Sequence, residues 1–156
     1  MVLNQHFQLL AQYNQWMNGR LYAAAGRLDA SELAAERGAF FGSILGTLNH
    51  IVVGDTIWLQ RFAAHPSGAA LQDVAALPKP TLDSWVCDDL AALAVHRAWL
   101  DEQICRWVSD LSEDVLKGVF HYTNIKGVAT CKRFGHLLLH FFNHHTHHRG
   151  QVTTLL

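Results

Sequence analysis

The sequence predicts an all-α protein, a four-helix bundle with a short β-hairpin between the third and fourth helices. Long segments whose apolar residues recur at steps of three, four and seven alternate with stretches rich in Gly, Pro and Ser, which is the pattern of amphipathic helices joined by loops. The chain has 156 residues and contains neither an internal repeat nor a linker, so we expect a single domain over residues 1–156. Bundles build metal and ligand sites from side chains on facing helices.

The first two helices are predicted over residues 2–26 and 40–62. Asn14 interrupts the apolar stripe of the first helix, where an apolar residue is expected. The members of that stripe are Leu3, Phe7, Leu10, Met17, Leu21 and Ala24. The second helix has a main stripe that consists of Phe41, Leu45, Leu48, Val52, Leu59 and Phe62. Its opposite side, which carries His50, is also partly apolar because it includes Val53 and Ile57.

A loop is expected over residues 63–80, which contain all three prolines of the chain. The third helix is predicted over residues 84–109, with Thr81 or Asp83 as its N-cap. Its apolar positions are Trp85, Leu90, Leu93, Trp99, Leu100 and Trp107.

The stretch between the third and fourth helices does not have a helical pattern. Residues 119–123 and 128–131 are rich in β-prone side chains, and residues 124–127 between them suit a turn. We therefore predict a hairpin there. The fourth helix is predicted from Arg133 through Leu155.

Composition excludes several classes of protein. The chain has 12 basic and 13 acidic side chains, without the basic surplus that a non-specific nucleic-acid binder needs. No apolar stretch approaches the roughly 20 residues that cross a bilayer, and the N-terminus lacks the features of a signal peptide. Three cysteines without a CxxC pair (Cys87, Cys105 and Cys131) argue against a disulfide framework. We expect a cytoplasmic protein without nucleic-acid or membrane partners.

The unusual feature of the composition is its 11 histidines, six of which fall between residues 136 and 148. Several pairs have the i, i+4 spacing, but at about 100° per residue only His144 and His148 form such a pair on or beside the buried stripe. His145 also faces inward, so His145 with His148 at i, i+3 remains a rival pair. The other histidines of this helix are expected at the surface: His136, His140 and His147.

Two imidazoles in one apolar layer need partners. A buried histidine is usually satisfied by hydrogen bonds, but a divalent metal ion would satisfy both rings at once. A third ligand must then come from another helix, and His50 is the candidate because Gly46 and Gly54 lie one turn to either side. Close helix contact through these glycines, with His50 incidental, explains the residues at least as well. The residues alone leave both interpretations open.

Five segments of the sequence resemble the DinB family. They are GTLNH at 46–50, DTIWL at 55–59, NHHTHHRGQ at 143–151, YNQWMN at 13–18 and RGAFFGS at 37–43. The resemblance covers most of the chain in the right order, and its most specific part is the NHxxxHRGQ string.

The resemblance implies a four-helix bundle whose metal is held by His50, His144 and His148. Imidazole ligands suit zinc or nickel, so we expect one such divalent ion per chain. Some relatives are transferases or isomerases that use a low-molecular-weight thiol, and family members are commonly homodimers. Members usually continue past this last helix, so the resemblance also implies that residues are missing after Leu156.

We therefore expect a metal- and thiol-dependent transferase or isomerase that acts on a small-molecule substrate. The alternatives are a metal-dependent hydrolase and a non-catalytic, dimeric metal-binding protein of a stress response. Asn14 and Gln151 are candidate pocket side chains. Asp55 is expected to have a structural or capping role, and Arg149 is expected to pair at the surface or at an interface.

A helix that is apolar on two sides must bury both of them. If His50 faces a metal site, the main stripe of the second helix is left to pack between the subunits of a homodimer. Leu48 and Val52 would then lie in that interface. The rival expectation is that the segment 63–80 folds back over this stripe within one chain.

Overall fold

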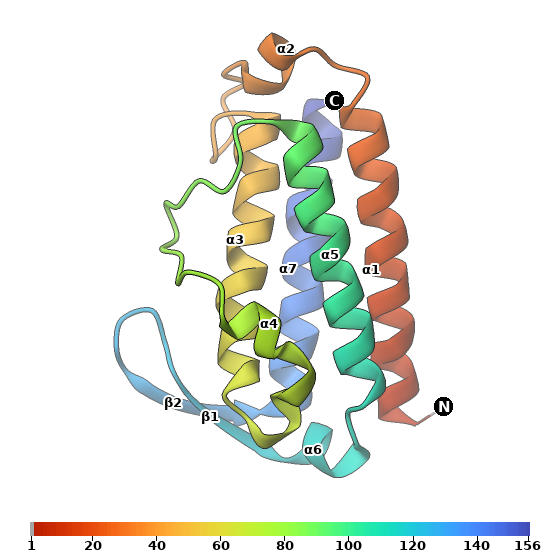
Figure 1. Cartoon of the computed structure of the whole chain (residues 1–156), viewed down its shortest axis with the longest axis vertical. Coiled ribbons are helices and arrows are strands. Elements are labelled where there is room, and N and C mark those ends of the chain that lie inside the picture. The colour runs from red at the N-terminus through yellow and green to blue at the C-terminus, as the bar shows by residue number, and fades with distance from the viewer. Residues whose placement is uncertain (1) are drawn as a thin grey trace.

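The computed structural model describes residues 2–156, and the prediction of a four-helix bundle with a small hairpin is confirmed. The long helices are α1 (Leu3–Ala25), α3 (Ile44–Ala63), α5 (Leu90–Ser109) and α7 (Phe134–Leu155). Helices α1 and α7 run in one direction, and α3 and α5 run in the other (Figure 1). Within the described part of the chain, no helix is both long enough and apolar enough to span a membrane.

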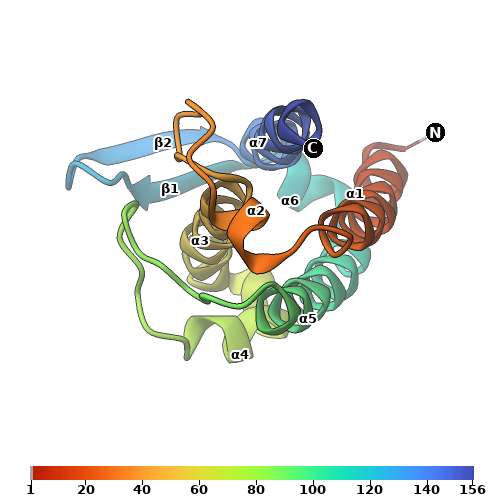
Figure 2. The same ribbon diagram turned by 90° about the horizontal axis from the view of Figure 1, so that it is seen from above.

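Short helical segments connect the long helices. They are α2 (Ala30–Ala34), the 3₁₀ helix η1 (Pro66–Leu71), α4 (Gln72–Ala75) and α6 (Glu113–Lys117). Because α3 and α5 are parallel, residues 76–89 must travel the length of the bundle between them, as Figure 1 shows. Seen from above, the four long helices stand at the corners of the bundle, and the hairpin projects beyond α3 and α7 (Figure 2).

The predicted start of the third long helix is wrong. Helix α5 begins at Leu90, because the side chain of Asp89 caps it by accepting a hydrogen bond from the backbone N–H of Ala92 at 2.8 Å. The expected caps, Thr81 and Asp83, instead bond to each other in the long connection, where the Thr81 hydroxyl donates to the Asp83 carboxylate at 2.6 Å.

Helix α3 also begins later than predicted. Ser43 is its N-cap and accepts a hydrogen bond from the N–H of Gly46 at 3.0 Å. The residues before it form a tight loop in which Gly42 has a φ of +74°, a conformation that favours glycine. Phe41 therefore lies outside the helix, where its ring stacks on the imidazole of His50 with centroids 3.8 Å apart.

The hairpin consists of β1 (Val119–Thr123) and β2 (Ala129–Arg133), paired antiparallel. Its turn is closed by a hydrogen bond from the N–H of Gly127 to the carbonyl of Asn124 at 3.0 Å, and Gly127 has a φ of +76°. The hairpin is thus confirmed. It lies directly before α7 in the chain.

The main stripe of α3 faces the bundle interior of a single chain. Leu48, Val52 and Leu59 are fully buried without a second subunit, so the expectation that this stripe forms a dimer interface is wrong. The segment after α3 folds back against the helix, and the Gln60 side chain donates to the carbonyl of Leu77 at 2.9 Å. The stripe is therefore buried within one chain, as the rival expectation required, while the cited contact of the following segment is made by Gln60, outside the stripe.

Candidate metal centre

Three histidines from two helices meet at one point. His50 comes from α3, and His144 and His148 lie one turn apart on α7. One ring nitrogen from each lies within 4.8 Å of the others, and the Nε2 atoms of His50 and His144 are 3.3 Å apart. Two nitrogens bound tetrahedrally to zinc at about 2.0–2.1 Å lie about 3.3 Å from each other. The donor set and its spacing therefore fit a divalent metal ion.

Gly54 makes room for this cluster. It follows His50 by one turn of α3, and a Cβ added there would lie 2.8 Å from Cε1 of His144. Any larger residue at this position would press on the imidazole of His144. Glycine at position 54 thus leaves space for the His144 ring and also allows α3 to pack closely against α7.

Neighbouring side chains orient the histidine rings. Nδ1 of His148 lies 2.7 Å from the Oε1 atom of Gln151. When that Nδ1 carries the hydrogen and donates it to Gln151, Nε2 is left with a free lone pair for a metal. The ring of Phe41 covers the other side, stacked on His50 and with its centroid 5.5 Å from that of His148. Gln151, expected as a pocket group, therefore contacts the cluster.

Burial keeps the cluster uncharged. It lowers the pKa of His50 to about 4, with a smaller contribution from the nearby His148. Burial likewise lowers the pKa of His144 to about 3 and moves the pKa of His148 in the same direction. Neutral imidazole is the form that binds a metal. The three rings are therefore in the ligating state at neutral pH.

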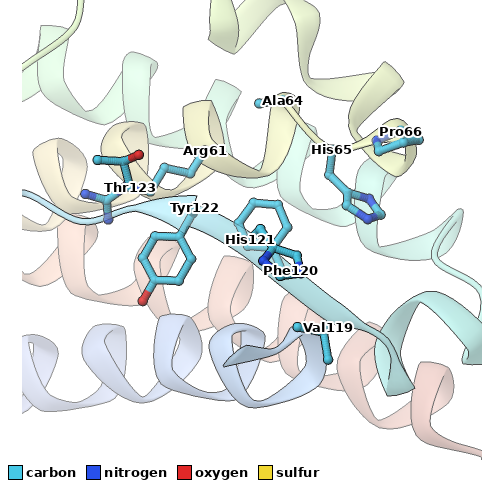
Figure 3. A pocket seen from close by; sticks show the side chains of 9 residues that line it. All are labelled: Arg61, Ala64, His65, Pro66, Val119, Phe120, His121, Tyr122 and Thr123. Atoms are coloured by element: carbon cyan, nitrogen blue, oxygen red, sulfur yellow. The ribbon is translucent and has the colours of Figure 1, made fainter. Parts of the chain in front are cut away.

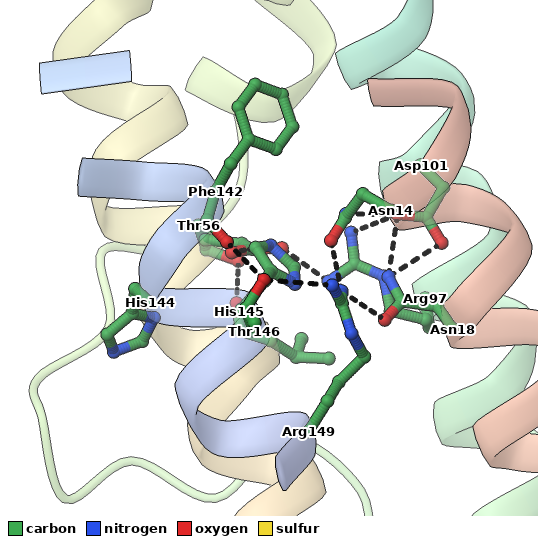
Figure 4. Close-up of polar contacts among 12 residues, drawn as sticks. Asn14, Asn18, Thr56, Arg97, Asp101, Phe142, His144, His145, Thr146 and Arg149 are labelled. Carbon is green, nitrogen blue, oxygen red and sulfur yellow. Dashed lines mark hydrogen bonds and ion pairs between the residues drawn. The ribbon is translucent and has the colours of Figure 1, made fainter. Parts of the chain in front are cut away.

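His145 belongs to a different site. It points to the opposite side of α7 from His144 (Figure 4), and its Nε2 lies 2.6 Å from Oδ1 of Asp55. Asp55 is also paired with Arg97, which in turn pairs with Asp101 at 2.9 Å. Burial by itself would raise the pKa of Asp55, but the charges of His145 and Arg97 outweigh this and lower it. These contacts support the structural role expected for Asp55.

Arg149 and Asn14 join the same buried network. The Arg149 guanidinium donates to the side-chain oxygen of Asn14 and, at 3.2 Å, to that of Asn18. Arg149 is only 4% exposed, so its expected place at the surface is wrong. Asn14 contacts this network rather than the three histidines.

The sequence analysis missed Arg97, Asp101 and Asn18. A signal for them existed, because Arg97 with Asp101 and Asn14 with Asn18 are i, i+4 pairs on otherwise apolar helix faces. Polar residues spaced in this way on two helices indicate a shared buried network.

The fold and the histidine cluster together define a four-helix bundle with a candidate metal centre between two of its helices. The chain matches the DinB family over residues 2–156 and belongs to that family. It is also 24% identical over 147 residues to Protein DinB of Bacillus subtilis (strain 168), an alignment that covers 94% of this chain and 82% of the relative. No solved structure matches it significantly.

Proposed function

We propose that the protein is a metal-dependent enzyme in which His50, His144 and His148 hold one divalent ion, zinc or nickel. The observation that carries this proposal is the convergence of three histidine side chains beside a cavity of about 250 Å³ that His50 and His144 help to line. Three protein ligands leave a tetrahedral ion one open position, as in catalytic sites. When bound, the ion would lower the pKa of a coordinated thiol or water and present the anion as a nucleophile.

We propose a low-molecular-weight thiol as the nucleophile, in a transferase or isomerase reaction with a small-molecule substrate. The protein's own cysteines do not suit this role. Burial raises the pKa of Cys87 and of Cys105, which disfavours the reactive thiolate, and no cysteine lines the cavity beside the histidines. Gln151 would hold His148 in the ligating tautomer, and Phe41 would exclude water from one side of the cluster.

Metal analysis of the purified protein tests the centre itself. We expect about one divalent ion per chain in the wild type, loss of the ion in His50→Ala, and full retention in the control His136→Ala, since His136 is an exposed residue of α7 outside the cluster. Equal retention in both variants would overturn the proposed ligand set.

A turnover screen then separates the candidate activities. Metal-loaded protein is assayed with electrophilic substrates in the presence and absence of small thiols. Turnover that requires the thiol supports the transferase or isomerase. Turnover without the thiol favours the hydrolase, and stoichiometric metal without any turnover favours a metal-binding protein. The homodimer also stays a prediction, which light scattering at micromolar concentration tests.

A further inference from the structure

The cavity beside the histidine cluster contains an arginine without an acidic partner. This cavity of about 250 Å³ lies between α3, α7 and the hairpin, and none of its lining residues is acidic. Arg61 lines it together with His50 and His144. Among residues 2–156, no carboxylate lies within ion-pairing distance of the Arg61 guanidinium.

Aromatic rings hold Arg61 in place instead. Its Cζ atom lies 4.8 Å from the ring centroid of Trp58 on α3 and 5.6 Å from that of Tyr122 on β1. Figure 3 shows Arg61 reaching from α3 toward the strand that carries Tyr122. Arginine stacked on aromatic faces keeps its planar fork of N–H donors ordered, and that fork matches the oxygens of a carboxylate or phosphate. The donors are thus arranged for an anion that the chain itself does not supply.

A continuous wall connects Arg61 to the histidine cluster. The ring of His140 lies 5.5 Å from that of Trp58 and 6.4 Å from that of His144. Arg61 follows His50 by three turns of α3, a rise of about 16 Å, and side chains on a helix lean back toward its N-terminus. A small molecule of moderate length can therefore contact both ends of the cavity at once.

We propose that Arg61, seated on Trp58 and Tyr122, binds the oxyanion of a small-molecule ligand whose other end reaches the three-histidine cluster. This inference rests on the proposed metal-dependent function and specifies its substrate class as anionic small molecules, either carboxylates or phosphate-type anions. Arg61 also lines a neighbouring cavity of about 420 Å³ between β1 and the segment that joins α3 to η1. Only the cavity with the histidines allows one ligand to bridge the two sites.

The experiment uses ligands that bridge the two sites by design. The full chain is loaded with Co²⁺ and titrated with ω-mercaptocarboxylates of increasing length, from mercaptopropionate to mercaptoundecanoate, and with mercaptoalcohols of equal length. Thiol binding is followed by the sulfur-to-cobalt absorption band. We expect the carboxylate to bind about tenfold more tightly than its matched alcohol at intermediate lengths, and to show no such preference at the shortest length.

Two substitutions test the assignment to Arg61. Arg61→Gln should abolish the carboxylate preference and leave the affinity of the alcohols unchanged, whereas Arg61→Lys, which keeps the charge without the planar fork, should retain part of it. The matched control is Arg20→Gln, because Arg20 is likewise stacked on a tryptophan, with its Cζ 5.2 Å from the Trp16 ring, but lies on the exposed face of α1. Arg20→Gln should keep the full preference.

The outcomes separate this inference from the proposed function. A protein that binds no cobalt refutes the metal centre. A protein that binds cobalt and thiols but shows no carboxylate preference, or the same preference at every length, refutes the role of Arg61 alone. Mercaptoalkylphosphonates of the same lengths decide between the two anion types, since the better-matched anion should show the larger loss of affinity in Arg61→Gln.

Discussion

Substitution of Gly54 by alanine should separate metal binding from stability. The new Cβ would lie 2.8 Å from Cε1 of His144, whereas carbon atoms in ordinary contact are about 3.5–4.0 Å apart. The imidazole must therefore move by about 1 Å, several times the roughly 0.2 Å tolerance of a metal–ligand distance. We expect metal affinity to fall at least about tenfold, the range seen when the groups that orient a ligand are lost.

Stability should change in the opposite direction or very little. Alanine is favoured over glycine within a helix by about 1 kcal/mol, which offsets the cost of moving the half-buried imidazole of His144. The matched control is Gly19→Ala in α1, where an added Cβ meets nothing within 4 Å. Competition against a chromogenic chelator gives the metal affinity, and urea denaturation of the metal-free protein gives the free energy of unfolding. Wild-type metal affinity in Gly54→Ala, with Gly19→Ala behaving as expected, would refute the role assigned to Gly54.

Three further predictions concern pH and the interior. Burial lowers the pKa of His50 to about 4 and that of His144 to about 3, whereas in the unfolded chain both histidines take up a proton near pH 6.5. The unfolding free energy of the metal-free protein should therefore decrease as pH falls from about 6.5 to about 4. Urea titration at several pH values measures this. Asp55→Asn should lower the unfolding free energy by about 3–5 kcal/mol, because it removes the buried carboxylate that pairs with both Arg97 and His145, and should also weaken metal binding in the chelator assay. Leu48→Lys with Val52→Lys should unfold the protein, as circular dichroism would show, rather than yield a folded monomer, since both positions are fully buried within one chain.

The long helices were predictable because their patterns are strong, whereas their ends depend on local competition. Thr81, Asp83 and Asp89 all have side chains that can cap a helix, and only the packed structure decides that Asp89 does so. The stripe of α3 was misassigned for a related reason. Its periodicity shows that Leu48 and Val52 are buried, but not whether a second subunit or the rest of the same chain covers them.

The histidine pair on α7 was predictable from the helical wheel, since His144 and His148 lie one turn apart beside the buried stripe. The wheel also placed His145 facing inward, and that too is observed, because His145 is fully buried. Its partner could not be predicted, since a wheel treats one helix at a time and Asp55 comes from another. The wheel of α7 likewise says nothing about α3, so the residues alone left His50 open as the third ligand, and only the resemblance to the DinB family favoured it.

The metal centre and the buried network meet at consecutive residues of the same two helices. On α3, Gly54 gives room to His144 and Asp55 pairs with His145. Consecutive residues of a helix point about 100° apart, so the pairing of His145 with Asp55 on one side of α7 fixes the rotation that presents His144 on the other. A buried ion pair is a weak source of stability compared with apolar packing, but it can impose one arrangement on the elements that it joins. The network that Asp55 anchors would therefore act on the metal centre through the orientation of α7, which is why its loss should weaken metal binding as well as the fold.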